Sequence, residues 1–452
     1  MSTNPDQEGL LNEVNAFLAA NADVEQIELL ASDIPGNFFS KLFPIRMLPE
    51  LAKNGLNLPR AMYVLSTVSE SMSDDVGLGG EDGDPDIKVT IAPGTLSRIT
   101  WGDRPRAQAL VKSARDNIVV DPREVLRQVI AQYAAHNLRP VVAFELEFTY
   151  FDNDRSGAGS LKTVKNPRTG HEDIASMLRA DRLDDFETVL TETIKHCDEQ
   201  GIPTTTICAE FGAGQFEINF PHDTDALQAA DFAQLFRRTV KSVARRHGMR
   251  ASFMAKPDFD RAGNGQHIHV SVLDHAGKNI FSNGDTHTPT LMHAIGGLCA
   301  TAPEAMSYWA PNINSYRRFM PENCVPTGAT WAHEHRHIAF RIPLANGAAW
   351  RIENRLPGAD ANCYLTLATT LAGILHGIVN KIIPPAESKG APEMDYDGFP
   401  LTMDDAIHAT REGKILGDYL GNDFNALYVN HREGELKSFE TFISKRELDW
   451  YL

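Results

Sequence analysis

The sequence feature that most constrains the fold of this chain is the alternation of polar and apolar residues that begins at His267 in GNGQHIHVS, residues 263–271. His267, His269 and Ser271 occupy every second position there, and aliphatic residues lie between them. A period of two is typical of a β-strand, because successive side chains of a strand point to opposite faces. The segment therefore predicts a strand that carries two imidazoles and a hydroxyl on the same face.

Carboxylates occupy the polar positions of three further segments that show similar alternation. VVAFELEFTYF, which begins at residue 141, has Glu145 and Glu147 two positions apart. AEFGAGQFEINF, which begins at residue 209, has Glu210 before a glycine turn and Glu217 on the strand expected after it. AAWRIENRLPG, which begins at residue 348, has Glu353 between two arginines. Alternation places the polar side chains of each strand on one face.

The five glutamates and two histidines of these four segments predict a metal site. Carboxylates that gather in a partly dry cleft repel each other unless cations neutralise them. A ligand set rich in carboxylate with one imidazole suits Mg²⁺ or Mn²⁺ better than zinc. One such strand alone is more often a solvated face, but four of them in one chain favour a shared site.

Arginines add a second theme, in the order Arg317, Arg318, Arg336, Arg341, Arg351 and Arg355. Guanidinium groups bind carboxylates and phosphates in a fork geometry. Metal ions and arginines around one cleft describe a site for phosphoryl transfer. The sequence has no Walker-type loop and no kinase glycine loop, so the nucleotide would be held in another way. For Arg317 and Arg351, pairing with structural acids is an equally good interpretation.

The composition limits the partners and the compartment. There are 60 Asp and Glu against 43 Lys and Arg, a net charge of -17, which repels nucleic acid and anionic lipid. The five cysteines form no CxxC pair and fit a reducing compartment. The N-terminus lacks the features of a signal peptide, and no apolar run approaches the roughly 20 residues of a membrane helix. We therefore expect a cytoplasmic protein with neither nucleic acid nor membrane as a partner.

Helices and strands alternate along the chain without a regular βαβ repeat, which indicates a fold of the α+β type. Asp121 is the expected N-cap of one helix, with Pro122 in its first turn. A change in the sequence pattern divides the chain into a small α+β domain, residues 1–115, and a larger domain of sheet and helices, residues 116–452. The elements predicted from periodicity are helices over 10–20, 121–138, 183–190, 227–248 and 361–382 and a strand over 139–151.

These motifs, in this order, resemble those of the glutamine synthetase superfamily, through nearly the whole chain. The matching stretches are GDPDIKVTIAPGTL, ELE, AEFGAGQFE, GNGQHIHVS, NSYRRF, RIENRLPGADANCYL, ELKSFE and ELDWYL. The resemblance implies a small N-terminal β-grasp domain and a larger catalytic domain with an antiparallel sheet and helices. It also implies active sites between neighbouring subunits, usually in a dodecamer of two hexameric rings.

The resemblance further implies that ATP phosphorylates the γ-carboxylate of glutamate and that an amine then displaces phosphate. Two or three Mg²⁺ or Mn²⁺ ions would serve each site. By motif position, the first ion would be held by Glu147, Glu210 and Glu217. The second, which bridges the ATP phosphates, would be held by Glu145, His267 and Glu353. The nucleotide would lie beside His269, Ser271, Arg336 and Arg341. Glutamate would lie beside Gly263, Arg318 and Arg355, and the two residues expected to be catalytic are Arg318 and Arg336.

Several positions depart from the ammonium-using enzymes of this family. Their flap carries a glutamate that helps to deprotonate ammonium, and counting back from Arg336 without gaps places Cys324 there, with Glu322 out of register. Their ammonium site also uses an aspartate, but the corresponding stretch here, MYVLSTVSESM, has none before Asp74. Ala262 replaces an asparagine that contacts the glutamate backbone. For Cys324, a small neutral filler is a better interpretation than a nucleophile, because phosphorylation already supplies the reactive acyl group.

Loss of two acids weakens the negatively charged cage that desolvates ammonium and accepts its proton. We therefore predict an ATP-dependent ligase that joins glutamate to an organic amine, similar to the γ-glutamylpolyamine and other γ-glutamylamine synthetases, with polyamine catabolism as one expected role. A polyamine would need acids along its path, which the loop GLGGEDGDPD, residues 77–86, could supply, whereas a hydrophobic amine would not. Two alternatives stay open: an ammonium-using glutamine synthetase, and an inactive family member that serves as an oligomeric scaffold.

Overall fold

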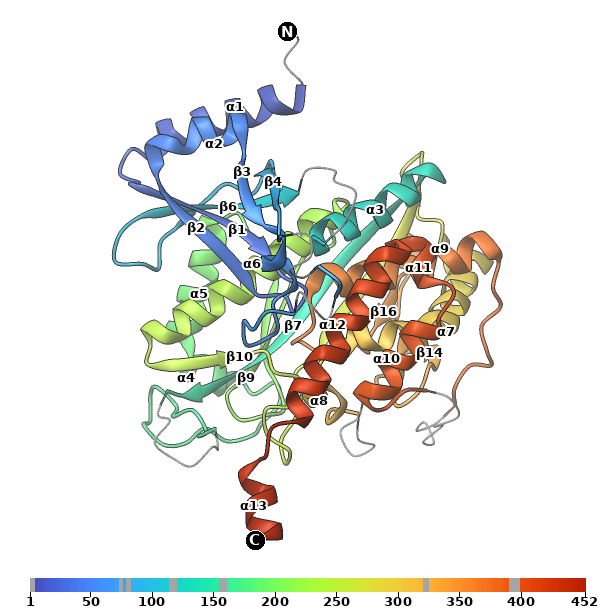
Figure 1. Cartoon of the computed structure of the whole chain (residues 1–452). Coiled ribbons are helices and arrows are strands. Elements are labelled where there is room, and N and C mark those ends of the chain that lie inside the picture. The colour runs from blue at the N-terminus through green and yellow to red at the C-terminus, as the bar shows by residue number, and fades with distance from the viewer. Residues whose placement is uncertain are drawn as a thin grey trace.

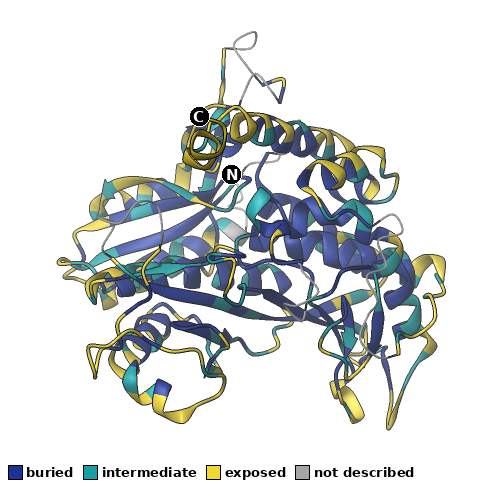
Figure 2. Cartoon of the chain, turned by 90° about the horizontal axis from the view of Figure 1, so that it is seen from below, coloured by how far each residue is buried: buried dark blue, intermediate teal, exposed yellow. Residues whose placement is uncertain are grey.

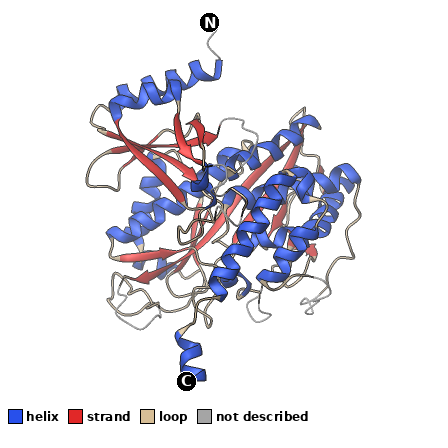
Figure 3. Cartoon of the chain, viewed as in Figure 1, coloured by secondary structure: helices blue, strands red, loops and turns tan. Residues whose placement is uncertain are grey.

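The structure of the protein is a computed structural model. It describes residues 5–72, 76–78, 83–113, 120–153, 161–319, 325–389 and 399–452. Two sheets with surrounding helices make up an α+β fold, with a small N-terminal part beside a larger one (Figure 1, Figure 3). The predicted fold class is confirmed. The predicted domain boundary at residue 115 lies outside the described residues.

The described residues of the N-terminal part form a six-stranded sheet in the order β2-β1-β6-β4-β3, with β5 paired to β6. Strands β1 and β6 are parallel, and the other neighbours are antiparallel. Helices α1 and α2 pack against each other beside this sheet (Figure 1). The arrangement is consistent with the expected β-grasp domain. The elements are α1 (Pro5–Ala20), β1 (Gln26–Ser32), β2 (Phe38–Pro44), α2 (Leu48–Asn54), β3 (Leu56–Pro59), β4 (Asp86–Ile91), β5 (Ser97–Ile99) and β6 (Arg106–Ser113), with 3₁₀ helices at Ile45–Met47 and Arg60–Val64.

The larger part is built on a second sheet, whose order among the described residues is β14-β15-β16-β11-β7-β9-β8, with β10 paired to β7. Neighbouring strands are antiparallel apart from β14 and β15. Strand β7 is 15 residues long and is paired with three others, β9, β10 and β11. The strands are β7 (Leu138–Asp152), β8 (Thr206–Ala209), β9 (Gln215–Asn219), β10 (Met249–Ser252), β11 (Gln266–Asp274), β14 (Trp331–His333), β15 (Phe340–Ile342) and β16 (Ile352–Asn354), beside the small hairpin β12 (Ser282–Asn283) and β13 (Thr286–His287).

Helices cover this sheet, and its apolar face and the helix faces packed on it form the core (Figure 2). Helices α3 and α6 pack directly on β7, and α9 packs on α3, α6 and α7. The predicted N-cap is confirmed, because the Asp121 carboxylate accepts a hydrogen bond from Arg123 N at 2.9 Å. The helices are α3 (Pro122–Ala135), α4 (Ala180–Asp185), α5 (Glu187–Glu199), α6 (Ala226–Arg246), α7 (Pro289–Trp309), α8 (Ile313–Tyr316), α9 (Cys363–Asn380), α10 (Met403–Glu412), α11 (Leu416–Leu420), α12 (Asn422–Glu440) and α13 (Lys445–Tyr451), with a 3₁₀ turn at Gly347–Ala349.

One predicted helix is divided in the structure. The segment 183–190 contributes to both α4 and α5, and Phe186 between them leaves helical geometry at φ -103° and ψ 10°. Its ring is fully buried, stacked on Tyr150 at a centroid distance of 6.2 Å and packed edge-on against Phe216 at 5.1 Å. Aromatic packing of this kind outweighs the local helical pattern.

Helix α9 packs unusually close to α7. A Cβ at Gly297 of α7 would lie 2.2 Å from the Gly373 carbonyl oxygen of α9, and one at Gly377 of α9 would lie 2.1 Å from the His293 carbonyl oxygen. Glycine therefore allows the two backbones to approach each other. By length and composition α9 is also apolar enough to span a membrane, but 78% of it is buried inside the protein, as in a core helix.

The chain ends in an extension that we call the C-terminal arm, residues 439–452. Helix α13 within it has no buried residue, and it projects away from the rest of the protein at the lower end of Figure 1. Large apolar side chains of the arm are open to solvent, among them Phe442 at 73%, Trp450 at 69% and Tyr451 at 79% exposure. An exposed apolar surface of this kind marks a site of interaction.

Candidate active site

Strand pairing brings the predicted ligands together on the polar face of the second sheet. On β11, His267 lies opposite Glu145 of β7, and His269 lies opposite Glu353 of β16. Glu147 of β7 lies opposite a residue of β9, Glu217. Side chains of directly opposed residues on one face are close enough to interact. The spacing of these groups is therefore set by the sheet itself.

These residues line one cavity of about 900 Å³. The predicted site residues on its wall are Glu145, Glu147, Glu210, Glu217, Gly263, His267, His269, Arg318, Arg336, Arg341, Glu353 and Arg355. Ser271 lies on the same strand as the two histidines, but it is buried and is not part of the described cavity wall. The four segments recognised by their alternation thus contribute to one site.

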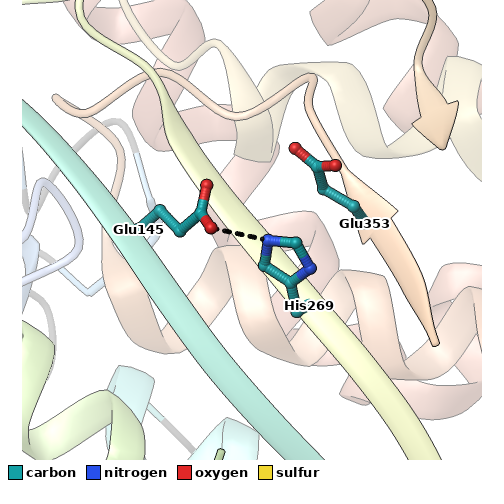
Figure 4. Close-up of side chains that lie close together, drawn as sticks. All are labelled: Glu145, His269 and Glu353. Atoms are coloured by element: carbon teal, nitrogen blue, oxygen red, sulfur yellow. Dashed lines mark ion pairs between the residues drawn. The ribbon is translucent and has the colours of Figure 1, made fainter. Parts of the chain in front are cut away.

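Imidazoles and guanidinium groups contact the carboxylates at one end of the cavity. His269 Nε2 lies 3.0 Å from Glu145 Oε1 (Figure 4). His267 Nδ1 lies 3.3 Å from Glu145 Oε2. The Glu353 carboxylate accepts hydrogen bonds from Arg355 and, at 2.9 Å, from Arg341 Nη1.

The pKa values at this end follow from the ion pairs. Burial alone would raise the pKa of Glu145, but hydrogen bonds from His267 and His269 hold it far below the usual range. Burial is likewise outweighed at Glu353, where Arg355 and the two histidines lower the pKa to about 2. Both carboxylates are thus charged ligands at neutral pH.

The carboxylates at the other end have no such partners. Burial, together with the charge of Glu147, raises the pKa of Glu210 to about 7. Burial and the same neighbour, with Glu145 and Glu210, raise the pKa of Glu217 to about 9. Both shifts mean that nearby positive charge, such as that of Arg336 at Glu210, does not offset burial and the neighbouring carboxylates, and a bound cation would do so.

The donor set fits divalent cations. Three groups of side chains have ligand atoms that lie within 4.8 Å of one another, and they are Glu145, His269 and Glu353; Glu145, Glu217 and His267; and Cys208, Glu210 and Glu217. Carboxylate oxygens dominate these groups, which suits Mg²⁺ or Mn²⁺. The grouping differs from the predicted one: His269 and the Cys208 thiol each join a ligand group, Glu217 is grouped with Glu145 and His267, and the predicted ligand Glu147 is in none of the three groups.

A match to the family model described as glutamine synthetase, catalytic domain, covers residues 119–451. The chain belongs to the glutamine synthetase family. The predicted family is therefore confirmed, and five of the motifs that indicated it contribute residues to the cavity wall, namely ELE, AEFGAGQFE, GNGQHIHVS, NSYRRF and RIENRLPGADANCYL.

Relatives within the glutamine synthetase family include enzymes named for amines other than ammonium. The γ-glutamylputrescine synthetase of Escherichia coli (strain K12) is 35% identical over 97% of this chain and 94% of its own length. The glutamate–isopropylamine ligase of a Pseudomonas species is 30% identical over 95% of each. Among solved structures, GmaS without ligand has a TM-score of 0.80 at 26% identity and covers 96% of this chain and 97% of its own. The predicted branch of the family agrees with these matches.

The glutamine synthetase motif NSYRRF places Arg318 inside the cavity wall. Its side chain is buried and donates to the carbonyl oxygens of Leu356 at 2.8 Å and Arg355 at 3.0 Å. Burial lowers the pKa of Arg318 to about 10, so the group still carries its charge at neutral pH. A buried guanidinium beside Gly263 and Ala262 is suited to a substrate carboxylate.

Other residues of this glutamine synthetase site were not predicted. Cys208 lines the cavity, and its Sγ lies 3.6 Å from Glu210 and 3.7 Å from Glu217. Alternation with Glu210 along β8 was the signal that could have revealed it. His222 packs against the His269 ring at 6.2 Å, and burial beside His269 and Arg351 lowers its pKa to about 4.

The two family departures that concern ammonium fall on Cys324 and on the stretch MYVLSTVSESM, residues 62–72. This stretch is described by the structure, whereas Cys324, Glu322 and Asp74 lie outside the described residues. Val325 and Pro326, directly after the first of them, line the cavity. Three apolar side chains on the cavity wall were also not predicted, namely Met177, Leu178 and Phe211.

Proposed function

We propose that this chain is an ATP-dependent ligase that joins the γ-carboxylate of glutamate to an organic amine. In the first step a γ-carboxylate oxygen takes the γ-phosphoryl group of ATP, which gives γ-glutamyl phosphate and ADP. In the second step the amine nitrogen attacks the acyl carbon, phosphate leaves and the nitrogen loses a proton. The observation that carries this proposal is one cavity whose described wall holds five glutamates, four histidines and five arginines, most of them in the glutamine synthetase motifs.

In this proposal two or three Mg²⁺ or Mn²⁺ ions offset the charge of the ATP phosphates and of the reacting carboxylate. The first would be held by Glu147, Glu210 and Glu217, whose raised pKa values at two positions support a need for a cation. The second would be held by Glu145, His267 and Glu353. The side chains keep the ligand oxygens in register, because they project from neighbouring strands.

Arginines and imidazoles of this chain would orient the remaining groups. The nucleotide would lie by His269, Ser271 and Arg341, of which Ser271 has the weakest support because the described cavity wall does not include it. Arg336 would bind the transferred phosphoryl group, where fixed positive charge stabilises the transition state. Glutamate would be held by Gly263, Arg318 and Arg355.

An organic amine is favoured over ammonium. The relatives named for putrescine and isopropylamine support this choice, as does the absence of the two ammonium-site acids from the expected sequence positions. An ammonium-using enzyme stays the alternative. A scaffold without catalysis has no need for unneutralised buried carboxylates, which raise the free energy of the folded state.

The proposal includes an assembly of two hexameric rings with active sites between subunits. The C-terminal arm supports an assembly, since its exposed Phe442, Trp450 and Tyr451 need a covering partner. A cytoplasmic location and the domain boundary at residue 115 stay predictions.

Phosphate release from ATP tests the proposed function. The assay holds the full chain, Mg²⁺, glutamate and one of ammonium, methylamine, ethanolamine, putrescine, isopropylamine or benzylamine. We expect release that requires glutamate and one organic amine and that is lost in Glu353→Gln. A dominant response to ammonium would support the alternative enzyme. No response to any amine, with ATP still bound, would contradict the ligase.

A further inference from the structure

One region of the cavity wall has no role in the proposed function. It consists of Met177, Leu178 and Phe211, which we call the apolar lip. Their side chains are 40%, 66% and 63% exposed, respectively. Large apolar side chains that gather at the wall of a polar cavity are a feature that solubility alone does not explain.

The backbone at Leu178 supports a use for its side chain. Leu178 has φ of +56°, a left-handed conformation that is disfavoured for a bulky residue and tolerated by glycine and asparagine. Leu178 N donates to Ala209 O at 2.9 Å, which fixes the lip against the end of β8. Burial within the chain does not compensate for this conformation, because the side chain is exposed. Strained residues of this kind are found where a ligand is contacted.

A buried ion pair holds the lip in position. Arg182 donates to the carbonyl oxygens of Ser176 at 3.0 Å and Glu210 at 2.7 Å, and so joins the segment before Met177 to the segment before Phe211. Its partner Asp173 lies 2.9 Å away, and both side chains are only 3% exposed. The lip is therefore a fixed surface beside the proposed metal ligand Glu210.

The charges around the lip limit what can bind there. The carboxylates on the described cavity wall are Glu145, Glu147, Glu210, Glu217 and Glu353, and the proposed function uses each of them for metal ions. A diamine would bring a second ammonium group without a further carboxylate on this wall to pair with it. An alkyl or arylalkyl group would instead remove the apolar surface of the lip from water.

We propose that the apolar lip binds the non-reacting substituent of the amine, and that the substrate is a primary monoamine with an apolar substituent. This inference rests on the proposed function and names the amine class of the same site. It excludes ammonium as the preferred substrate, because ammonium has no substituent. It also predicts that diamines are poorer substrates than apolar monoamines.

The first test compares kcat/KM of the full chain for isobutylamine, benzylamine, putrescine and ammonium, with ATP, Mg²⁺ and glutamate saturating. We expect one apolar monoamine to exceed putrescine and ammonium by roughly 10-fold or more. Putrescine at or above the monoamines would overturn the inference and leave the ligase proposal standing. Ammonium at or above the monoamines would overturn the inference and support the ammonium-using alternative. No turnover with any amine would overturn both.

Two variants test the lip directly. Leu178→Asn keeps the left-handed backbone and removes the alkyl group, so kcat/KM for the preferred monoamine should fall roughly 10-fold, with KM for ATP and the unfolding temperature unchanged. Met177→Glu supplies a carboxylate, so the putrescine to monoamine ratio should rise roughly 10-fold. The matched control is Ile383→Glu, an 82% exposed residue outside the described cavity wall, which should leave the ratio unchanged.

Light scattering on the same samples tests a second explanation of the apolar lip, namely that it is an interface between subunits. If the lip variants change the mass of the assembly but not the amine ratio, the lip is an interface between copies of this chain. That result would overturn the proposal. An unchanged mass with a shifted ratio supports it.

Discussion

Individual carboxylates in the cavity differ in the charge that surrounds them. Glu353 is neutralised by Arg341 and Arg355, whereas Glu217 faces other glutamates. The second kind of position lowers the stability of the metal-free protein, and binding of a cation offsets this cost. Stability and cation binding are therefore in conflict at Glu217.

Glu217→Gln should raise the free energy of unfolding of the metal-free protein by about 1–3 kcal/mol at pH 8. Glu217, with a pKa of about 9 in the folded protein, must take up a proton on folding at that pH, whereas glutamine is neutral without one. Mg²⁺ at 100 times its dissociation constant should stabilise the unchanged protein by about 2.7 kcal/mol. The variant should show little of this response. Thermal unfolding with and without EDTA measures both effects, and a metal-free variant that is less stable than the parent would contradict the argument.

Asp33 is a buried carboxylate between the N-terminal sheet and the larger part, where Asn362 Nδ2 donates to its main-chain oxygen at 2.9 Å. Burial raises its pKa from 3.8 to about 7, although hydrogen bonds from Asn37 oppose the shift. The folded protein thus keeps a proton that the unfolded chain releases. The contribution of this group to stability is complete below about pH 4 and is lost as the pH rises to about 7.

The unfolding free energy of the parent protein should fall between about pH 4 and pH 7.5, and Asp33→Asn should reduce this fall. The reduction should be at most about 1.4 kcal/mol for each pKa unit by which folding raises the pKa of Asp33. Urea unfolding at a series of pH values measures this slope. Asp274→Asn is the control, since backbone hydrogen bonds from Lys278 and Ala276 lower the pKa of that exposed carboxylate. An equal flattening in both variants would show that Asp33 is not the source.

At the scale of elements, the contact between α7 and α9 depends on glycine. Gly297→Ala would place a methyl group 2.2 Å from the Gly373 carbonyl oxygen, so the helices would have to move apart. Overpacking of this kind costs about 1–3 kcal/mol, which we expect as a lower unfolding free energy. Gly9→Ala in α1 is the matched control, because nothing lies within 4 Å of its added methyl group. That variant should gain up to about 1 kcal/mol from helix propensity, and similar results for the two variants would contradict the packing argument.

Elements with a strong period were predictable from the sequence. The alternation around Glu145 and His267 placed their side chains on one face, and antiparallel pairing then made them direct neighbours. The division at Phe186 was not predictable, because it depends on rings supplied by distant strands. The apolar lip was missed for the same reason: Met177 has no local pattern, and its place on the cavity wall depends on contacts that Arg182 makes far along the chain.

At the scale of the whole molecule, the C-terminal arm is the part least explained by the single chain. Removal of residues 442–452 deletes Phe442, Trp450 and Tyr451, which make no buried contact. The shortened chain should therefore have the same unfolding free energy per monomer as the full chain. In solution it should form a smaller assembly with fewer subunits. Analytical ultracentrifugation of the two chains measures the number of subunits in each assembly. An unchanged number would show that the arm does not hold the assembly together.

Activity should follow the same change if sites lie between subunits. The shortened chain would then lose most of its amine-dependent phosphate release, even though every described residue of the cavity wall is still present. Full activity in a monomer would contradict shared sites.

The buried ion pair of Arg182 and Asp173, which we call the clamp, has a consequence for how this protein can change in evolution. Ligands on adjacent strands tolerate few changes, because a shift of one residue turns every side chain to the other face. Arg182 instead holds main-chain oxygens, which are present whatever side chains the lip carries. Exchange of Met177 or Phe211 leaves the clamp and the strands intact. The amine specificity of such a protein can therefore change in evolution through a few substitutions at the lip, while the residues proposed to bind the metal ions and ATP stay the same.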